Sequence, residues 1–514
     1  MSACPRLRVL GALLVSPVLA LASLPLVASP ASAVSTDQSY WVPASRSVVV
    51  RGHGYGHGHG MSQYGAQGAA LKGLTYRQIV AFYYPRTTLS TMTGRVRVLI
   101  TSDTTSDVVV NRVAGMTLRD LGSGTTYKLP TPSGLTQWRI TVGAGNRSVV
   151  DYLTGSWHRW KPGGNAALSG DGEFAAPSSL TLRTPYGTRA FRGTIRSASP
   201  RAGSASRDTV NVLSMDDYVR GVIPTEMPAS WHPEAVKAQA VAARTYATWS
   251  RSQYPNRYYQ ICDTTSCQVY GGVGAEDPRS NTAVAATARQ ILRYDGSPAF
   301  TQFSSSSGGW TSAGSVPYLT AKADPYDDFD GNPVHDWTTT LSAASIQRAY
   351  PAVGTLRRIH VVRRDGNGQW RGRVWTLVLD GTKSDVTASG DSFRSVFGLR
   401  STWFSVDATP IIARWTSLGG ARSPVGDVVT REYAVTGGSL QRFEKGRIYH
   451  SRPTGARELY GPILKTYRNR GGVSSALGYP TSGVQTITGG QRATFRGGAI
   501  TWSRSTGRTT VKLS

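Results

Sequence analysis

The sequence predicts an α+β protein: a mixed, strand-rich domain with a central helix, followed by a small β-rich module of repeats. Three observations support this prediction. Short apolar, β-branched runs separated by turn residues are typical of strands. One long stretch, residues 233–247, has apolar residues at helical spacing. Residues 409–514 repeat a pattern at a fixed interval.

The composition is that of a globular, strongly basic protein. It excludes a collagen, a coiled coil and a disulfide-dense miniprotein. Lys and Arg number 57 against 30 Asp and Glu, which gives a formal net charge of +27. High basicity often indicates nucleic-acid binding, but these cations are scattered and export is expected. We therefore expect no nucleic acid and expect anionic cell-wall polymers as partners; solubility and surface retention alone are the alternative.

The first 33 residues are expected to be a secretory signal peptide. Two Arg precede an apolar run over residues 9–27, and Ala31 and Ala33 supply the small residues of a cleavage site. The alternative is a transmembrane anchor, but Pro17 and Pro25 interrupt the run. We expect a secreted, cell-wall-associated protein without a stable membrane span after cleavage.

Residues 51–60 alternate glycine with larger side chains. An extended chain would place the glycines on one side and His53, Tyr55, His57 and His59 on the other. The bare glycine side would permit close approach of a backbone or a ligand, and the His/Tyr side suits a sugar. Clustered histidines also suggest a metal site, but the motif contains no carboxylate, so we expect no metal and no cofactor.

Further elements follow along the chain. Thr75 and Gln78 form a capping box that opens a helix. Residues 301–330 are rich in Ser and Gly and are expected to form loops. Strands are expected at 96–100, 107–110, 137–140, 358–362 and 373–379.

A candidate site surrounds Glu226. Because a proline lies two residues to either side, we expect this carboxylate on a constrained loop, outside any helix. A helix follows from Pro233, and Lys237 and Arg244, seven residues apart, share one of its faces. A glutamate at the foot of a helix with two aligned cations indicates a site. The alternative is a surface glutamate beside a solvated helix face.

Two other groups of residues bear on the chemistry. Cys262 and Cys267 remain after removal of the leader, and in an oxidising compartment they favour a disulfide. Two free thiols are the alternative, and a zinc site would need two more ligands. The Asp-rich segment 324–330, which includes Asp327, is a rival source of a second carboxylate; otherwise it forms a turn or a solvated loop.

The C-terminal repeat has a period of 52 residues, which aligns Gly438 with Gly490 and Phe443 with Phe495. Leu-Gly-Tyr-Pro at 477–480, followed by Phe-x-x-Gly-x-Ile, resembles LGFP repeats. That resemblance implies a small β-rich module associated with cell walls. A structural appendage without a ligand is the alternative.

Residues 48–406 resemble the SpoIID/LytB family of stage II sporulation protein D and amidase enhancers. The resemblance rests on Glu-Met-Pro-Ala-Ser-Trp from Glu226 and on Glu-Ala-Val-Lys-Ala-Gln-Ala-Val-Ala-Ala-Arg-Thr-Tyr-Ala at 234–247. Further motifs agree at 56–66, 262–272, 304–311 and 392–404. In the family, the Gly-His motif usually follows the segment that ends here at Phe404. Its position at 52–66 indicates a circular permutation, which would put residues 48–66 beside Phe404.

The resemblance implies a lytic transglycosylase that acts on peptidoglycan glycan strands, with Glu226 as its catalytic residue. The alternative is a non-catalytic, wall-binding enhancer of a cell-wall amidase. The expected substrate-binding residues are Lys237, Arg244, His57, His59, Ser62, Gln63, Tyr64, Ser305 and Thr311. The expected organisation is a signal peptide (1–33), a Gly/His segment of the SpoIID-like domain (34–91), the SpoIID/LytB-like domain (92–408) and an LGFP-like wall module (409–514).

A single glutamate suffices for that reaction. Hydrolysis of a glycosidic bond usually takes two carboxylates, whereas a lytic transglycosylase uses one residue first as acid and then as base. The acid step requires a raised pKa, which burial of Glu226 beside Trp231 or Tyr246 would give. Because cations would lower that pKa, we expect Lys237 and Arg244 to orient substrate and loops without contacting the glutamate.

Overall fold

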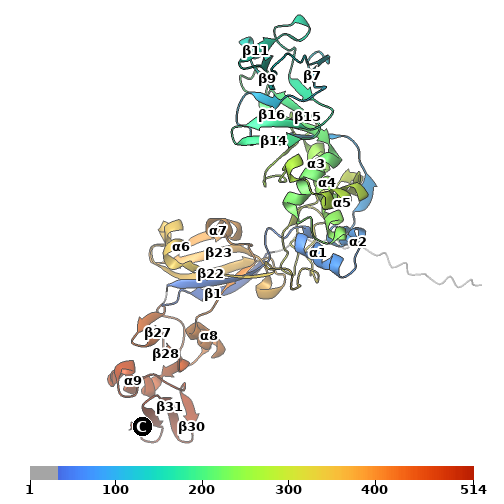
Figure 1. The fold of residues 1–514 in the computed structure, drawn as a ribbon. Coiled ribbons are helices and arrows are strands. Elements are labelled where there is room, and N and C mark those ends of the chain that lie inside the picture. Colours follow the sequence, from blue (N-terminus) through green and yellow to red (C-terminus); the bar gives the residue numbers. More distant parts are fainter. Residues whose placement is uncertain (1–32, 45) are drawn as a thin grey trace, which may run out of the picture.

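The computed structural model describes residues 33–44 and 46–514 (Figure 1). The expected signal peptide, apart from Ala33, lies outside the described residues. Helices and strands are mixed throughout, which confirms the α+β class. Among the described residues, no helix is long and apolar enough to cross a membrane. The α-helices are α1 (Gln63–Leu71), α2 (Tyr76–Tyr83), α3 (Met215–Glu226), α4 (Pro233–Gln253), α5 (Pro278–Ala286), α6 (Ala343–Ala349), α7 (Gly390–Phe397), α8 (Pro410–Ser417) and α9 (Gly461–Asn469).

Two large sheets and helices α1–α5 share one hydrophobic core. The seven-stranded sheet has the order β17 (Ile261–Cys262), β5 (Arg95–Leu99), β16 (Asp208–Ser214), β15 (Thr194–Ala198), β12 (Gly172–Ala175), β7 (Thr117–Asp120), β8 (Thr126–Lys128). The six-stranded sheet has the order β11 (Trp157–Trp160), β10 (Ser148–Leu153), β9 (Gln137–Val142), β6 (Val108–Asn111), β13 (Leu180–Thr184), β14 (Gly187–Phe191). The three strand predictions in this region are confirmed to within a few residues by β5, β6 and β9.

The N-terminal strands belong to a second core, built mainly from residues 337–406. One sheet has the order β1 (Val34–Trp41), β22 (Leu356–Arg364), β23 (Val374–Gly381), β24 (Val386–Ser389), and another has β21 (Asp336–Ser342), β2 (Ser47–His53), β25 (Phe404–Val406). Figure 1 shows blue β1 alongside β22. Gly52 pairs directly with Phe404. The contact that the permutation predicts is therefore confirmed.

Two small sheets add to the first core. One has the order β19 (Ser297–Pro298), β18 (Gln290–Tyr294), β4 (Thr88–Thr91), and the other pairs β20 (Phe303–Ser304) with β3 (Met61–Ser62) in parallel. The capping box at Thr75 is present at the start of α2. Helix α4 begins at Pro233 as expected and buries an Ala-rich stripe against the core.

The C-terminal residues form two equivalent four-stranded sheets, each preceded by a helix, α8 or α9. Their cores consist only of residues from this segment. The 52-residue period is confirmed, since β27 and β31 begin at Gly438 and Gly490. The strands are β26 (Tyr433–Val435), β27 (Gly438–Arg442), β28 (Gly446–Ser451), β29 (Gly455–Tyr460), and then β30 (Gln485–Ile487), β31 (Gly490–Phe495), β32 (Gly498–Ser503), β33 (Thr509–Leu513).

Candidate active site

Glu226 faces a cleft of about 310 Å³. Sequence segments that are far apart form its walls: the Gly-His motif, the end of α3, helix α4, the disulfide loop and the start of β20. The cleft is lined by His57, Glu226, Tyr246, Thr265, Ser266, Cys267, Val269, Gln302 and Phe303. Among these described lining residues, Glu226 is the one carboxylate.

The local structure at Glu226 differs from the expected loop. Glu226 is the last residue of α3, and Pro224 lies inside the final turn. The turn persists because the backbone N–H of Met227 still donates to the carbonyl of Ile223, at 2.9 Å. Pro224 removes one helical hydrogen bond, but it does so in the final turn. The helix therefore still continues to Glu226. The carboxylate is consequently held by regular helical backbone.

The surroundings of Glu226 favour its protonated form. Burial raises the pKa of the carboxyl above its usual value, and one hydrogen bond, from the backbone N–H of Val269 to Oε1 at 3.0 Å, partly opposes that rise. Tyr246 lines the cleft, as expected, whereas Trp231 packs against Tyr64 with ring centroids 4.8 Å apart. A carboxyl in this environment can donate a proton and, once ionised, accept one.

The Gly-His motif brings a neutral imidazole to the same cleft. The backbone N–H of His59 donates to Nδ1 of His57 at 2.9 Å, so the neutral ring of His57 carries its proton on Nε2. The two rings stack with centroids 5.0 Å apart. The side chain of His57 reaches solvent through the cleft. Burial of the ring, followed by the charges of His59 and Arg373, nevertheless lowers the pKa of His57. His57 is therefore a hydrogen-bonding group here and adds no charge beside Glu226.

The alternation at residues 51–60 does not continue as an extended chain, so that expectation is wrong beyond His53, where β2 ends. Gly54 and Gly60 have φ values of +71° and +68°, a region that other residues rarely adopt. A Cβ at Gly60 would lie 2.0 Å from the carbonyl oxygen of Gln302. The expected close backbone approach is thus confirmed, with the loop at residues 302–308 as the partner.

Ser62 and Thr311 have internal roles in place of the expected substrate contact. Ser62 is fully buried, donates to Asp327 at 2.5 Å, and accepts from the backbone N–H of Gly65 to cap α1. Thr311 is 2% exposed and donates to the carbonyl of Thr320 at 2.8 Å. Both hydroxyls are satisfied within the protein, away from the cleft.

The Asp-rich segment forms a turn at Pro325 and Tyr326, one of the expected alternatives, with Asp328 and Asp330 exposed, and none of its carboxylates lines the cleft. Asp327 is 0% exposed and accepts hydrogen bonds from the loop at residues 306–308, from Ser62 and from Asn332. Asp324 is 2% exposed and accepts from Tyr83. Burial, followed by the charge of Asp327, raises the pKa of Asp324 to about 6. The two aspartates hold the wall of the site from behind.

Arg244 also has a structural position. Its side chain is 0% exposed and forms a 2.7 Å ion pair with Asp216 in the first turn of α3. It also donates to the carbonyls of Ala240, Val284 and Gln290. A buried guanidinium cannot touch a glycan, so Arg244 orients the helix that carries Glu226 and does not bind substrate directly.

The remaining expected contacts lie around the cleft without lining it. Lys237 forms a 2.7 Å ion pair with Glu234, away from Glu226. Tyr64 donates from its backbone N–H to the carbonyl of Ser305 at 2.9 Å. Gln63 is 8% exposed at the start of α1. Substrate contact by Lys237, His59, Gln63, Tyr64 or Ser305 stays a prediction.

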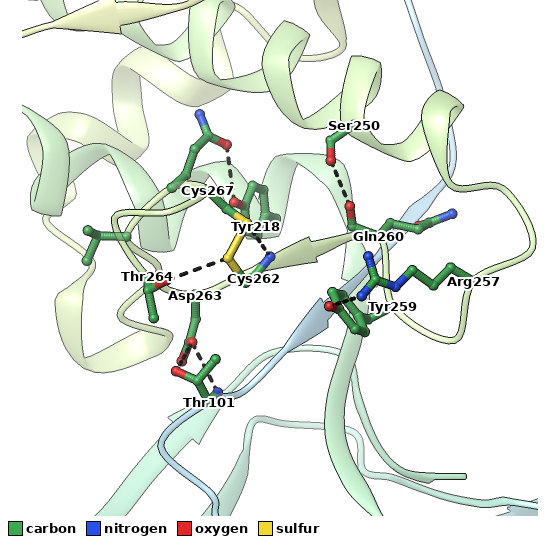
Figure 2. The surroundings of a disulfide bond; sticks show 12 residues. Thr101, Tyr218, Ser250, Arg257, Tyr259, Gln260, Cys262, Asp263, Thr264 and Cys267 are labelled. Atoms are coloured by element: carbon green, nitrogen blue, oxygen red, sulfur yellow. Dashed lines mark hydrogen bonds between the residues drawn. A yellow bond between two sulfur atoms is a disulfide. The ribbon is translucent and has the colours of Figure 1, made fainter. Parts of the chain in front are cut away.

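Cys262 and Cys267 form a disulfide with Cα atoms 5.5 Å apart. Figure 2 shows this bond beneath Tyr218, with Thr264 and Asp263 in the loop that it closes. Cys267 lines the cleft, and two residues later Val269 donates to Glu226. The disulfide therefore shapes the loop that holds the glutamate.

Opening this disulfide should lower the free energy of unfolding by about 2 kcal/mol, because the closed loop is short. We expect a lower midpoint of denaturant unfolding in reductant than without it. The double variant Cys262→Ser, Cys267→Ser is the control, since reductant should not change its midpoint. Equal midpoints for the parent protein in both conditions would contradict the prediction.

One group of side chains has the composition of a metal site. His53, His335 and Asp336 place one ligand atom each within 4.8 Å of one another. They already bond to each other, with His53 Nδ1 at 2.5 Å and His335 Nδ1 at 3.2 Å from the Asp336 carboxylate. The motif itself lacks a carboxylate, but β21 supplies one from a distant part of the sequence.

The sequence did not identify several residues of the cleft. They are Thr265, Ser266, Val269, Gln302 and Phe303. The first three lie within or just after the disulfide loop, and the last two immediately precede the Ser-rich segment at 304–307. These residues lie in or next to two motifs that resemble the family, and this was the sequence signal that could have identified them. Without the fold, nothing in those motifs distinguishes a lining residue from a buried one.

Comparisons with known proteins found matches both for the domain that holds the cleft and for the C-terminal repeats. A family model for the stage II sporulation protein, SpoIID, matches residues 204–294, and one for the LGFP repeat matches residues 424–475 and 477–513. The chain is 30% identical over 258 residues to stage II sporulation protein D of Bacillus amyloliquefaciens, covering 44% of this chain and 71% of that protein. It is 31% identical over 232 residues to the protein of that name from Bacillus subtilis (strain 168), covering 39% and 62%.

A more similar but shorter match involves a larger protein. The chain is 46% identical over 130 residues to the amidase enhancer of Bacillus subtilis (strain 168). That match covers 24% of this chain and 17% of the enhancer. The chain therefore spans well under two thirds of that relative.

Proposed function

Because the chain belongs to the SpoIID family, named for stage II sporulation protein D, we propose that it is a secreted lytic transglycosylase of peptidoglycan glycan strands. The comparisons confirm the resemblance to SpoIID and to LGFP repeats. The substrate in this proposal is the bond between N-acetylmuramic acid and N-acetylglucosamine. No cofactor is required.

One observation carries the proposal: Glu226 is the sole carboxylate among the described residues that line the cleft, and burial raises its pKa. An inverting or retaining hydrolase would need a second carboxylate on the opposite side of the bond. A transglycosylase needs one group that first gives and then takes a proton. The environment of Glu226 supports that use.

The proposed step follows from this single group. Glu226 gives its proton to the bridging oxygen as the bond from C1 of N-acetylmuramic acid to that oxygen breaks. The C6 hydroxyl oxygen of the same sugar bonds to C1, and its proton passes to the ionised Glu226. The products are a shortened strand and a 1,6-anhydro end, and the glutamate is protonated again. His57 and the polar residues of the disulfide loop would orient the sugar by hydrogen bonds.

A second candidate function is a non-catalytic enhancer of an N-acetylmuramoyl-L-alanine amidase, favoured by the 46% identity to the amidase enhancer. Incubation of the mature protein with glycan strands, with and without stem peptides, separates the two by product mass. Transglycosylation gives anhydro ends that are one water lighter than hydrolysis products. An enhancer gives no anhydro ends but increases peptide release when an amidase is added.

The raised pKa of Glu226 predicts the pH dependence of cleavage. Because the acid step needs the protonated carboxyl, kcat/KM should fall as pH rises through this pKa, and that fall should lie above the usual carboxyl value of 4.5. Phe303→Ala would admit water to the cleft and should move the fall to lower pH. A fall at the usual value in the parent protein would contradict the prediction.

The C-terminal repeats are proposed to retain the protein on the wall. Their cores contain only residues 411–511, which supports independent folding. Residues 409–514 expressed alone should therefore co-sediment with purified wall material. Unchanged binding and localisation of a chain that lacks them would show that the repeats are a structural appendage.

A further inference from the structure

A second and larger cavity, of about 650 Å³, is strongly basic. It lies between the end of β4, the start of β5, the last turns of α4 and the hairpin of β18 and β19. Four arginines line it, and its described lining residues include no carboxylate and no aromatic side chain. The four arginines are Arg95, Arg97, Arg251 and Arg293, and we call this space the arginine cavity.

The charges of these four arginines are not balanced. Among the described residues, none of the four forms an ion pair, and their bonds go to carbonyls and hydroxyls. Arg97 donates to the carbonyl of Pro255 at 2.7 Å, and Arg251 donates to the carbonyl of Thr93 at 3.1 Å. Arg293 donates to the carbonyl of Gly296 at 2.7 Å. Such bonds fix the direction of each guanidinium but leave its charge uncompensated.

Some other partly buried arginines of this chain are neutralised, although the buried Arg207 also bonds to carbonyls and a hydroxyl. Arg139 pairs with Asp151, Arg192 with Glu276 and Arg196 with Glu173, each at 2.9 Å or less. Within the arginine cavity, burial lowers the pKa of Arg97 and Arg251, and the charges of Arg196 and then Arg251 add to the effect at Arg97. Bringing like charges together without an acid costs stability, which an anion in the cavity would recover.

We propose that the arginine cavity binds the phosphate groups of a phosphodiester-linked cell-wall polymer. Guanidinium groups match phosphate oxygens in a planar, two-pronged geometry, and Thr91, Thr93 and Ser252 add hydroxyls. A single carboxylate would occupy one arginine, whereas four arginines around 650 Å³ suit successive phosphates. Single-stranded nucleic acid is disfavoured because its binding relies on aromatic rings that stack on bases, and this lining has none.

The position of the cavity connects it to the cleft. Helix α4 contributes Tyr246 to the cleft and Arg251 to the cavity, a separation of about 7–8 Å along the helix axis. A wall polymer held there would keep attached glycan close to Glu226. Binding at the cavity is nevertheless independent of the proposed cleavage, because no residue lines both.

Titration of the mature protein with poly(glycerol phosphate) at physiological salt tests the proposal. The double variant Arg95→Gln, Arg293→Gln should raise Kd at least about tenfold, since each lost charge-assisted hydrogen bond weakens binding on that order. The control Arg119→Gln, Arg183→Gln removes the same charge from exposed strand residues and should change Kd less than about twofold. Anhydro-product formation from phosphate-free glycan should be the same in all three proteins.

Equal weakening by both double variants would overturn the proposal, because binding would then depend on net charge alone. A single-stranded oligonucleotide of equal charge serves as a second probe. Tighter binding of that probe through Arg95 and Arg293 would replace the wall polymer by nucleic acid. Loss of cleavage with normal polymer binding in a Glu226 variant would leave the cavity assignment intact.

Discussion

Glu226→Gln should lower the rate of anhydro-product formation by about 10²–10⁴-fold, the usual contribution of general acid–base catalysis. The amide keeps the size of the side chain and can still accept from the backbone N–H of Val269, but it cannot give a proton. Product analysis by mass spectrometry with purified glycan strands provides the measurement. Retention of wild-type rates by the variant would exclude Glu226 as the acid.

The same variant should not lose stability at neutral pH. A carboxyl whose pKa is raised in the folded state stabilises the fold below its unfolded pKa, and that contribution is lost as pH rises through the folded pKa. Above the folded pKa the ionised Glu226 therefore costs stability, and Gln removes this cost. We expect an equal or higher Tm for Glu226→Gln, as is common when an active-site charge is removed.

Glu234→Gln is the matched control for Glu226. Glu234 pairs with Lys237 and accepts from the backbone N–H of Tyr76, so it joins α4 to α2 outside the cleft. Its replacement should cost a little stability and leave the cleavage rate within about a factor of two. If instead both glutamine variants retain amidase stimulation and neither parent nor variant forms anhydro ends, the enhancer function is correct.

Asp327→Ala should produce the largest loss of stability, about 4 kcal/mol or more. Five donors point at the Asp327 carboxylate: the hydroxyls of Ser62 and Ser306, the backbone N–H groups of Ser307 and Gly308, and the amide of Asn332. Each buried donor left without a partner costs about 1–3 kcal/mol. We expect Tm to fall by about 10 °C, measured by calorimetry.

The neighbouring Asp328 offers a control of the same residue type. It is exposed, so Asp328→Ala should change stability by no more than about 0.5 kcal/mol. Any loss of activity in Asp327→Ala should accompany its lower Tm, in contrast to Glu226→Gln. Reducing-end products from the parent protein, together with a stable but inactive Asp327→Ala variant, would restore the two-carboxylate hydrolase and refute the transglycosylase mechanism.

Local sequence rules predicted the elements that carry the site. Pro233 at a helix start and the Thr75 capping box depend on neighbouring residues, and the period of 52 residues is visible along the chain; each appears where expected. The contact that a circular permutation implies was also predictable, because the order of motifs is visible in the chain. It required Gly52 to lie beside Phe404, and these residues pair.

Local rules failed where one sequence pattern is compatible with two different structures. Lys237 and Arg244 are equivalent on a helical projection, yet Lys237 is partly exposed while Arg244 is completely buried against Asp216. The alternation of glycine with larger residues at 51–60 predicted an extended strand, because a spacing of two residues carries no information about the φ angles of the glycines. The four positive-φ glycines instead coil the chain against a loop some 250 residues away in the sequence.

By itself the sequence determined the family, the position of Glu226 shortly before helix α4, and the repeats at the C-terminus. These features depend on motifs and their spacing. Only the tertiary structure decided which polar residues face solvent, because burial depends on segments that meet from distant parts of the chain. It directed Ser62 and Asp327 inward, gathered four arginines into one cavity, and left Glu226 as the single carboxylate among the described residues of the cleft. The raised pKa on which the proposed chemistry depends comes from that assembly, since no local stretch of sequence can desolvate its own side chain.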